Sequence, residues 1–157
     1  MLRPTLTLCL LLLPLLILAQ TVTGVAIVTD GDSLEIRGTS IRLHGIAPES
    51  RQLCTRPSGR QWRCSQQAAR ILSDRIGRRG VDCVARDIDC YGRTIAVCSQ
   101  DGVDLNASMV HEGWEVAYRQ CSRDYVREET DARRAVRTIW SGSFVIAWAW
   151  LGGARLP

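Results

Sequence analysis

Short β-forming segments alternate with turn residues in the first third of the chain, and this pattern restricts the fold more than any other feature. Residues 22–29 are apolar and rich in β-branched side chains, and residues 33–37 and 40–45 alternate apolar with polar side chains. Asp30-Gly31-Asp32 and Gly38-Thr39 separate these segments, and both are typical turn sequences. We therefore expect three consecutive antiparallel strands.

Further strands and helices follow along the chain. Their predicted order is helix 65–76, strands 81–86 and 94–98, helix 107–112, strand 114–118 and helix 124–138. Ser65, Asn106 and Asp124 stand where N-cap residues are favoured. Short antiparallel strands with a helix after the third predict a small five-stranded barrel of the OB type with three helices, an α+β, mainly β architecture.

Residues 1–20 are predicted to be a secretory signal peptide. Arg3 supplies a short positive region, residues 5–18 form a leucine-rich apolar run, and Ala19 is small enough to precede a cleavage site. The run is short for a membrane-spanning helix, so an uncleaved membrane anchor is the less favoured alternative. We expect residues 21–157 to form one secreted or periplasmic domain, monomeric and with no stable membrane insertion.

Signal cleavage would remove Cys9 and leave an even number of cysteines, which favours disulfides in an oxidising compartment. One predicted pair flanks a hairpin, one brackets a loop, and the third follows by elimination. These pairs are Cys83–Cys98, Cys54–Cys64 and Cys90–Cys121. The clustered CxxC or Cys/His spacing of a zinc site is absent from the sequence.

The basic residues are all arginine, 20 in number, and the formal net charge is +4 at pH 7. Loss of Arg3 with the signal peptide leaves +3. Codon bias in a GC-rich genome is one explanation for the absence of lysine. Phosphate recognition is the other, because a guanidinium group binds phosphate through two parallel hydrogen bonds. The charge itself favours polyanionic partners only mildly.

Three short motifs carry residues that are suited to phosphate chemistry. They are DGDS at 30–33, RLHGIAPES at 42–50 and DCYGR at 89–93. Taken singly, each has a plain structural interpretation: a β-turn, a surface Arg-Glu pair and the end of a hairpin. Carboxylates two residues apart around a glycine can also ligate a hard cation such as Ca²⁺.

Taken together, in this order and spacing, the three motifs resemble the thermonuclease (staphylococcal-nuclease-like) family. That family typically has DGDT or DGDS, then RLxGIDAPE, then DxYGR. The resemblance extends from about Val22 to Trp150 and includes LNASMVHEGWEVAYR. It implies an OB barrel and calcium-dependent cleavage of phosphodiester bonds in DNA and RNA.

The resemblance also implies a role for individual residues. Asp32 matches a calcium carboxylate, with Asp30 beside it in the outer shell. Arg42 matches the arginine that holds the scissile phosphate, and Arg93 matches the one that stabilises charge on the phosphoryl group. Glu49 matches the glutamate that orients or deprotonates the attacking water. Two arginines and a cation suit phosphate transfer, which depends mainly on positioning and charge stabilisation.

Two tyrosines fall where the family has nucleotide-contacting residues. Tyr91 and Tyr118 are therefore candidates for nucleotide binding, and ordinary packing in the barrel is the alternative for both. His44 and His111 match no catalytic position, and we expect both at the surface.

The family motif GIDAPE is shortened to GIAPE in residues 45–49, so an aspartate is deleted. In the family this aspartate is the second calcium carboxylate. Its loss predicts weaker calcium binding, because affinity depends on the number of charged ligands. The shorter turn can also re-aim Glu49, since catalytic geometry tolerates errors of only about 1 Å. We expect the turn, rather than the strand before it, to absorb the deletion.

Two alternatives to an active nuclease stay open at this point. The chain is also similar to short exported nuclease-like proteins of bacterial exopolysaccharide (succinoglycan) biosynthesis, which suggests a non-catalytic or repurposed role with acidic polysaccharide. A simpler alternative is an exported module that binds nucleic acid or another polyanion. A glycosidase pair of Asp32 and Glu49 is disfavoured, because neutral sugars need no pair of cationic arginines.

Overall fold

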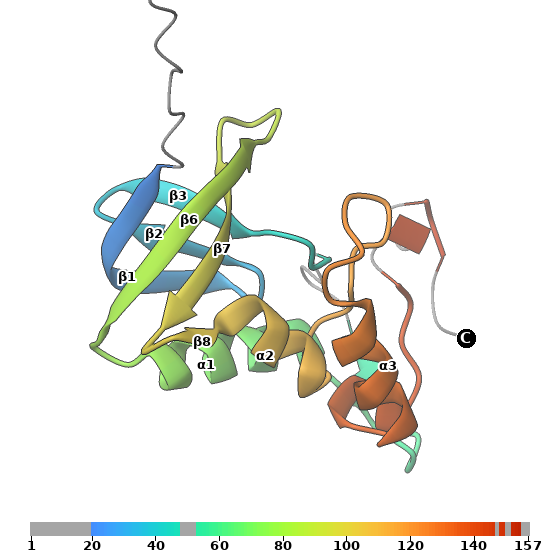
Figure 1. The fold of residues 1–157 in the computed structure, drawn as a ribbon. Helices are drawn as coiled ribbons and strands as arrows, with labels where there is room; N and C mark the ends of the chain where they lie inside the picture. Colours follow the sequence, from blue (N-terminus) through green and yellow to red (C-terminus); the bar gives the residue numbers. More distant parts are fainter. Residues whose placement is uncertain (1–19, 48–52, 147, 150–151, 155–157) are drawn as a thin grey trace, which may run out of the picture.

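The chain was analysed as a computed structural model that describes residues 20–47, 53–146, 148–149 and 152–154. Five strands form a closed mixed barrel in the order β3-β2-β1-β6-β7 (Figure 1). Their bounds are β1 Thr21–Asp30, β2 Ser33–Ile36, β3 Thr39–Leu43, β6 Gly80–Ile88 and β7 Thr94–Gln100. The predicted five-stranded barrel of the OB type is therefore confirmed.

Parallel pairing between β3 and β7 closes the barrel. Ile41, Arg42 and Leu43 lie opposite Thr94, Ile95 and Ala96. The other barrel pairings are antiparallel, and the short strand β8 (Val103–Asp104) extends the sheet beyond β7. Closure thus brings the second and third sequence motifs together, because Arg42 of the second lies in β3 and Arg93 of the third directly precedes β7.

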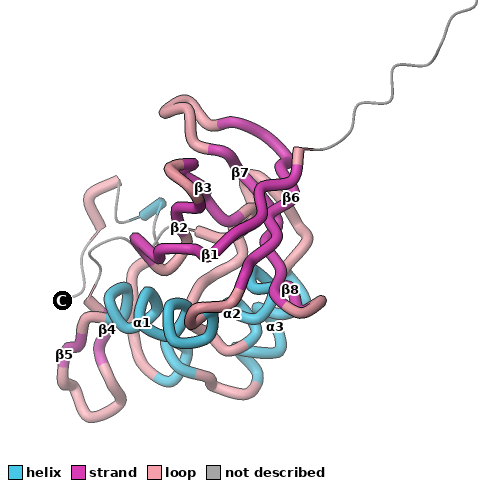
Figure 2. Tube along the Cα trace, turned by 90° about the vertical axis from the view of Figure 1, so that its left-hand side faces the viewer, coloured by secondary structure: helices cyan, strands magenta, loops and turns pink. Residues whose placement is uncertain are grey.

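Three helices gather at one end of the barrel (Figure 2). They are α1 Cys64–Ile76, α2 Leu105–His111 and α3 Val126–Arg134. Ala68, Leu72 and Ile76 form the buried stripe of α1 and join the barrel core. Their spacing of four residues is that of one helix face, as the sequence indicates. A 3₁₀ helix, Thr138–Ser141, follows α3.

Residues 53–63, between the third barrel strand and α1, contain a two-stranded hairpin. Strands β4 (Cys54–Thr55) and β5 (Gln61–Trp62) pair with each other and not with the barrel. The C-terminal segment attaches to this hairpin, since Thr55 and Ser143 exchange backbone hydrogen bonds of 2.8 and 2.9 Å. A second, smaller core lies here, formed by Ala47, Cys54, Cys64, Val116 and Ile139.

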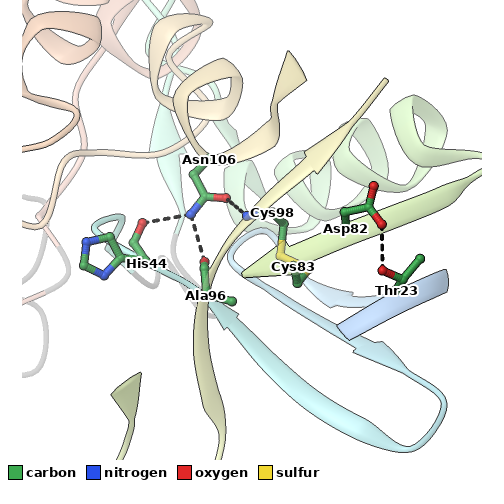
Figure 3. The surroundings of a disulfide bond; sticks show 7 residues. All are labelled: Thr23, His44, Asp82, Cys83, Ala96, Cys98 and Asn106. Atoms are coloured by element: carbon green, nitrogen blue, oxygen red, sulfur yellow. Dashed lines mark hydrogen bonds between the residues drawn. A yellow bond between two sulfur atoms is a disulfide. The ribbon is translucent and has the colours of Figure 1, made fainter. Parts of the chain in front are cut away.

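The structure contains two of the three predicted disulfides. Cys54 is bonded to Cys64, and Cys83 is bonded to Cys98 across β6 and β7 (Figure 3). Cys83 and Cys98 lie directly opposite each other on β6 and β7. Their positions on the two sides of a hairpin in the sequence therefore predicted the disulfide correctly.

The third predicted disulfide, Cys90–Cys121, is wrong. Both residues are exposed free cysteines. Cys90 lies at the tip of the β6–β7 hairpin, whereas Cys121 lies in a different turn, where its N–H donates to the carbonyl of Tyr118. Pairing by elimination assumed that every cysteine is oxidised, and the fold places these two in separate turns.

The predicted strand at residues 114–118 is not formed. The N–H groups of Trp114 and Glu115 both donate to the carbonyl of Met109. These bonds tie the segment to the C-terminal end of α2, where the chain forms turns instead of a strand. Within this segment, Ala117 makes an isolated β-bridge with Ile46.

The helix boundaries differ from the predicted ones because other residues fill the capping positions. Asp104, not Asn106, caps α2 by accepting the N–H of Ala107 at 2.9 Å. Ser65 lies inside α1, and α3 begins two residues after Asp124. Helix α3 stops at Arg134, before two non-glycine residues with positive φ, Val136 (53°) and Thr138 (45°).

Among the residues that the structure describes, we find no helix that is both long and apolar enough to cross a membrane. The apolar run of the predicted signal peptide lies outside those residues.

Candidate nucleotide-cleavage site

The first motif forms the turn between β1 and β2, and its glycine is required by close packing. A Cβ atom on Gly31 would lie 2.2 Å from Oε1 of Glu115 and 2.9 Å from Cβ of Ala68. Asp30 uses its Oδ1 to accept the N–H of Gly31 at 2.8 Å. The turn is therefore pressed against α1 and against a buried carboxylate, which fixes where Asp30 and Asp32 stand.

Asp32 is almost completely buried, with 2% of its surface exposed. Oδ1 accepts the hydroxyl of Ser33 at 2.8 Å, and Oδ2 has no hydrogen-bond partner among the described residues. Burial raises the pKa of Asp32 above its ordinary value, although the Ser33 hydrogen bond and the charges of Arg42 and Arg93 act in the opposite direction. Such a buried and incompletely satisfied carboxylate is typical of a functional site.

Arg42 reaches the same carboxylate from β3. Its Nε lies 3.5 Å from Oδ2 of Asp32. The pairing of β2 with β3 sets this contact, because Arg42 is the register partner of Ser33. The side chain of Arg42 remains 18% exposed, so the guanidinium group stands at the boundary between the barrel and solvent.

Arg93 comes from the end of the β6–β7 hairpin, one residue before β7. Asp89 holds it: Nε of Arg93 lies 2.7 Å from Oδ2 of Asp89, while Oδ1 accepts the N–H groups of Tyr91 and Arg93 at 2.9 Å each. Desolvation opposes ionisation of Asp89, but these hydrogen bonds outweigh it and lower its pKa below the ordinary value.

Each predicted tyrosine lies near one of the two arginines. The guanidinium carbon of Arg42 is 6.0 Å from the ring centroid of Tyr118, and that of Arg93 is 5.7 Å from the ring of Tyr91. Tyr91 is 82% exposed, so packing in the barrel does not explain it. Tyr118 is partly buried and packs against the smaller core, so the packing interpretation holds in part for this residue.

A cavity of about 210 Å³ adjoins Arg42. Its lining includes Tyr118, Ile95, Arg86 and His44. His44 is less exposed than expected: its side chain is 20% exposed, and Nε2 lies 3.1 Å from Oδ2 of Asp124. The cavity thus offers an aromatic ring and positive charge side by side, next to the arginine that faces Asp32.

The fold brings Arg42 to Asp32 through the 3.5 Å ion pair. The pairing of β3 with β7 places Arg42 opposite Ile95, two residues after Arg93. Asp30 lies two residues before Asp32, at the end of β1. Glu49, the predicted catalytic carboxylate, lies outside the described residues. Within the described part of the chain, no three or more His, Cys, Asp or Glu side chains cluster so as to hold a metal ion.

Sequence reasoning missed three residues that shape this site. Asp89 belongs to a quoted motif, and an aspartate before a tight turn is a signal that it accepts backbone N–H groups. Asn106 is buried and donates from Nδ2 to the carbonyls of His44 and Ala96, which ties β3 to β7 (Figure 3). Glu115 reaches Gly31 from a distant part of the sequence, and no local pattern indicates that contact.

Comparisons with known proteins identify the family of the chain. A sequence model described as staphylococcal nuclease homologue matches residues 40–142. The succinoglycan biosynthesis protein ExoI of Rhizobium meliloti (strain 1021) is 34% identical over 98 residues, which cover 60% of this chain and 51% of ExoI. An uncharacterized endonuclease of Haemophilus influenzae is 28% identical over 122 residues, covering 73% of this chain and 63% of the relative.

A third relative, protein ParB of Escherichia coli, is 28% identical over 142 residues, covering 78% of this chain and 75% of ParB. The chain therefore spans about half the length of ExoI and less than two thirds of the endonuclease.

Proposed function

Since the chain belongs to the staphylococcal nuclease homologue family, we propose that it is an exported nuclease that hydrolyses phosphodiester bonds in DNA or RNA with the help of Ca²⁺. One observation carries this proposal: the pairing of β3 with β7 places Arg42 opposite Ile95, two residues after Arg93, so the two arginines come from adjoining segments of the barrel. Arg42 also pairs with the buried carboxyl group of Asp32, at 3.5 Å. Two guanidinium groups on adjoining segments form a phosphate-binding arrangement that a neutral substrate would not need.

The proposed roles follow the charges. Arg42 holds the scissile phosphate, and Arg93, held by Asp89, stabilises the negative charge that develops on the phosphoryl oxygens. Glu49 accepts a proton from the attacking water as the new oxygen–phosphorus bond forms. The bond from phosphorus to the leaving oxygen then breaks, and that oxygen takes a proton from solvent. Tyr91 and Tyr118 contact the nucleotide beside each arginine.

Asp32 is the residue that best fits a calcium ion. Its buried Oδ2 lacks a hydrogen-bond partner among the described residues and lies 3.5 Å from Nε of Arg42, which supports Asp32 as an oxygen ligand for a cation. Asp30 stands beside it in the outer shell. A bound calcium ion would supply positive charge next to the phosphate. Since these two carboxylates make an incomplete shell, water and the phosphate itself would provide further oxygens.

Calcium binding is proposed to be weak, because the family's second aspartate is deleted between Ile46 and Ala47. Both of these residues are buried, with exposures of 1% and 0%. Ile46 forms a bridge to Ala117, and the N–H of Ala47 donates to the carbonyl of Val116 at 2.9 Å. Apolar side chains and backbone contacts therefore occupy the place where a carboxylate would enter, which supports a site with fewer charged ligands.

A nuclease assay on the oxidised chain tests the proposal. Single-stranded DNA and RNA are incubated with Ca²⁺ up to high millimolar concentration, with EDTA and Glu49→Gln as controls. Cleavage that depends on Ca²⁺ and is lost in Glu49→Gln is the expected result. No cleavage at any calcium concentration, from a chain shown to be folded, would contradict nuclease activity and leave a binding function.

A second candidate is a non-catalytic role in bacterial exopolysaccharide biosynthesis, favoured by the similarity to a protein named for succinoglycan biosynthesis. The same two arginines would then bind an acidic polysaccharide. The two candidates differ in their dependence on Glu49. A binding protein loses affinity on Arg42→Ala but is unaffected by Glu49→Gln, whereas a nuclease loses cleavage in both variants.

Export through a cleaved signal peptide, with a monomeric domain of residues 21–157, completes the proposal. The two disulfides support it, because disulfides persist in oxidising compartments. The intact mass of protein recovered from the periplasm or medium tests the cleavage, and light scattering of that protein tests the oligomeric state. Retention of residues 1–20 would instead favour a membrane anchor.

A further inference from the structure

The C-terminal segment continues beyond the family match, which ends at residue 142, and folds back toward the site. Ser143 pairs with Thr55, and the ring of Phe144 lies 4.9 Å from that of Trp140. Figure 1 shows residues 148–149, in red, beside the orange loop that follows Ala117. The segment therefore packs on the β4–β5 hairpin and reaches the loop that follows Ala117.

Trp148 connects the C-terminal segment to the candidate site. Its ring centroid lies 5.9 Å from that of Tyr118, with an angle of 35° between the planes. Tyr118 in turn lies 6.0 Å from the guanidinium group of Arg42 and lines the cavity beside it. Its hydroxyl donates to Oε1 of Gln120 at 3.1 Å, which fixes the ring. Tyr118 thus lies between Arg42, the arginine proposed to hold the phosphate, and Trp148.

The two rings are tilted and too close for a base to insert between them. Trp148 is nevertheless only partly buried where it packs against the smaller core, so the residue is not enclosed completely. An accessible aromatic ring beside a cationic cleft is the typical platform for an unpaired nucleobase, because every base has a π face that can stack on it.

We propose that Trp148 is a stacking subsite for one unpaired nucleobase that flanks the phosphate held by Arg42. This inference rests on the proposed function, since it assigns Trp148 to the binding of the same nucleic acid. Stacking requires a π face but no particular base, so the subsite increases affinity without sequence preference. It belongs to the C-terminal segment of this chain and lies outside the family match.

Equilibrium binding to a fluorescein-labelled oligothymidylate of about ten nucleotides, a length within the usual site size of an OB fold, tests the subsite. Fluorescence anisotropy in EDTA keeps the oligonucleotide intact. Trp148→Leu keeps an apolar side chain against Tyr118 but removes the π face, and we expect it to weaken binding about 5- to 50-fold. Trp148→Phe restores a ring and should bind within about threefold of the parent chain.

Phe144→Leu is the matched control. It removes another aromatic ring from the same segment, one that packs on Trp140 and not on Tyr118. We expect its affinity to equal that of the parent chain. Equal weakening in Phe144→Leu and Trp148→Leu would overturn the subsite, because it would show that the segment acts only by supporting the fold.

An abasic scan separates stacking from support. Each nucleotide of the oligonucleotide is replaced in turn by an abasic site. The parent chain should lose affinity at one position, and Trp148→Leu should be insensitive there while it responds like the parent elsewhere. Equal responses of the two proteins at every position would overturn the inference.

Failure of the subsite and failure of the proposed function give different results. A parent chain that neither binds the oligonucleotide in EDTA nor cleaves it in Ca²⁺ overturns both. A parent chain that binds, together with a Trp148→Leu variant of unchanged affinity, overturns only the subsite.

Discussion

Asp89 and Arg93 form an ion pair within a single turn, with Oδ2 of Asp89 2.7 Å from Nε of Arg93. The other oxygen of Asp89 accepts the N–H groups of Tyr91 and Arg93. One carboxylate thus fixes both the backbone of the turn and the guanidinium group that it presents. Arg93 is oriented before any substrate binds, which lowers the cost of positioning it.

Asp89→Asn should lower kcat/KM for nucleic acid cleavage about 10- to 100-fold, because Arg93 loses the charge that orients it. The pKa of Asp89 lies below its ordinary value, so the carboxylate is ionised at neutral pH and its contribution is lost only as the pH falls through that lowered pKa. The defect should therefore be constant between about pH 6 and about pH 9. Initial rates across this range measure it.

Asp101→Asn is the control for that prediction. Asp101 pairs with Arg79 at another exposed turn, between β7 and β8. The loss of that pair should leave kcat/KM unchanged. Equal defects in the two variants would show that Asp89 acts through general charge and not through Arg93.

Native alkylation should distinguish the cysteines. We expect iodoacetamide to modify Cys90 and Cys121, which are free and exposed, and to leave the cysteines of the two disulfides unmodified. Peptide mass spectrometry without reduction reads the result. A peptide that links Cys90 to Cys121 would contradict the structure and restore the third predicted disulfide.

The barrel disulfide should also contribute to stability. Replacement of both Cys83 and Cys98 by alanine should lower the free energy of unfolding by about 2–4 kcal/mol, since the bond closes a loop in the unfolded chain. Urea titration of the double variant measures the loss. Complete reduction of the parent chain should lower the midpoint at least as far, because it also opens the Cys54–Cys64 disulfide.

The strands could be predicted from the sequence because their signals are local. A β-branched apolar run identifies β1, and alternation of apolar and polar residues identifies β2 and β3. A glycine marks each turn between them, and these signals do not depend on the rest of the molecule. Helix boundaries are less local. Asp104 caps α2 in place of Asn106 because Asn106 is buried between β3 and β7, where its amide serves three backbone groups.

The site could be predicted only where a motif carried it. Asp32, Arg42 and Arg93 are predicted site residues because three ordered motifs resemble one family, and the pairing of β2, β3 and β7 places their segments side by side. Contacts between distant segments have no such signal: the approach of Glu115 to Gly31 and the packing of Trp148 on Tyr118 each depend on how a loop or tail folds back.

Asn106→Ala should destabilise the barrel by about 2–3 kcal/mol. The variant removes hydrogen bonds of 3.0 and 3.2 Å to the carbonyls of His44 and Ala96 and a bond of 3.1 Å from the N–H of Cys98. All three groups lie where β3 and β7 close the barrel, so we expect faster hydrogen exchange there. Gln66→Ala, at an exposed position of α1, is the control and should leave stability within about 0.5 kcal/mol of the parent.

Asp32→Asn should abolish cleavage and yet stabilise the fold at neutral pH. Burial raises the folded-state pKa of Asp32, so the folded protein binds this proton more tightly than the unfolded chain does. Below the ordinary pKa the carboxyl group is protonated in both states, and stability falls as the pH rises from that value through the raised pKa. The asparagine variant never ionises. In EDTA at about pH 7 it should melt about 2–6 °C above the parent chain, and the difference should vanish near about pH 3.5.

Calorimetry at both pH values measures this difference, with Asp74→Asn, on the exposed face of α1, as the control. The control should melt with the parent chain at both pH values, because an exposed carboxylate gains little from losing its charge. An Asp32→Asn variant less stable than the parent at neutral pH would mean that the ion pair with Arg42, at 3.5 Å, outweighs the cost of burying the carboxylate.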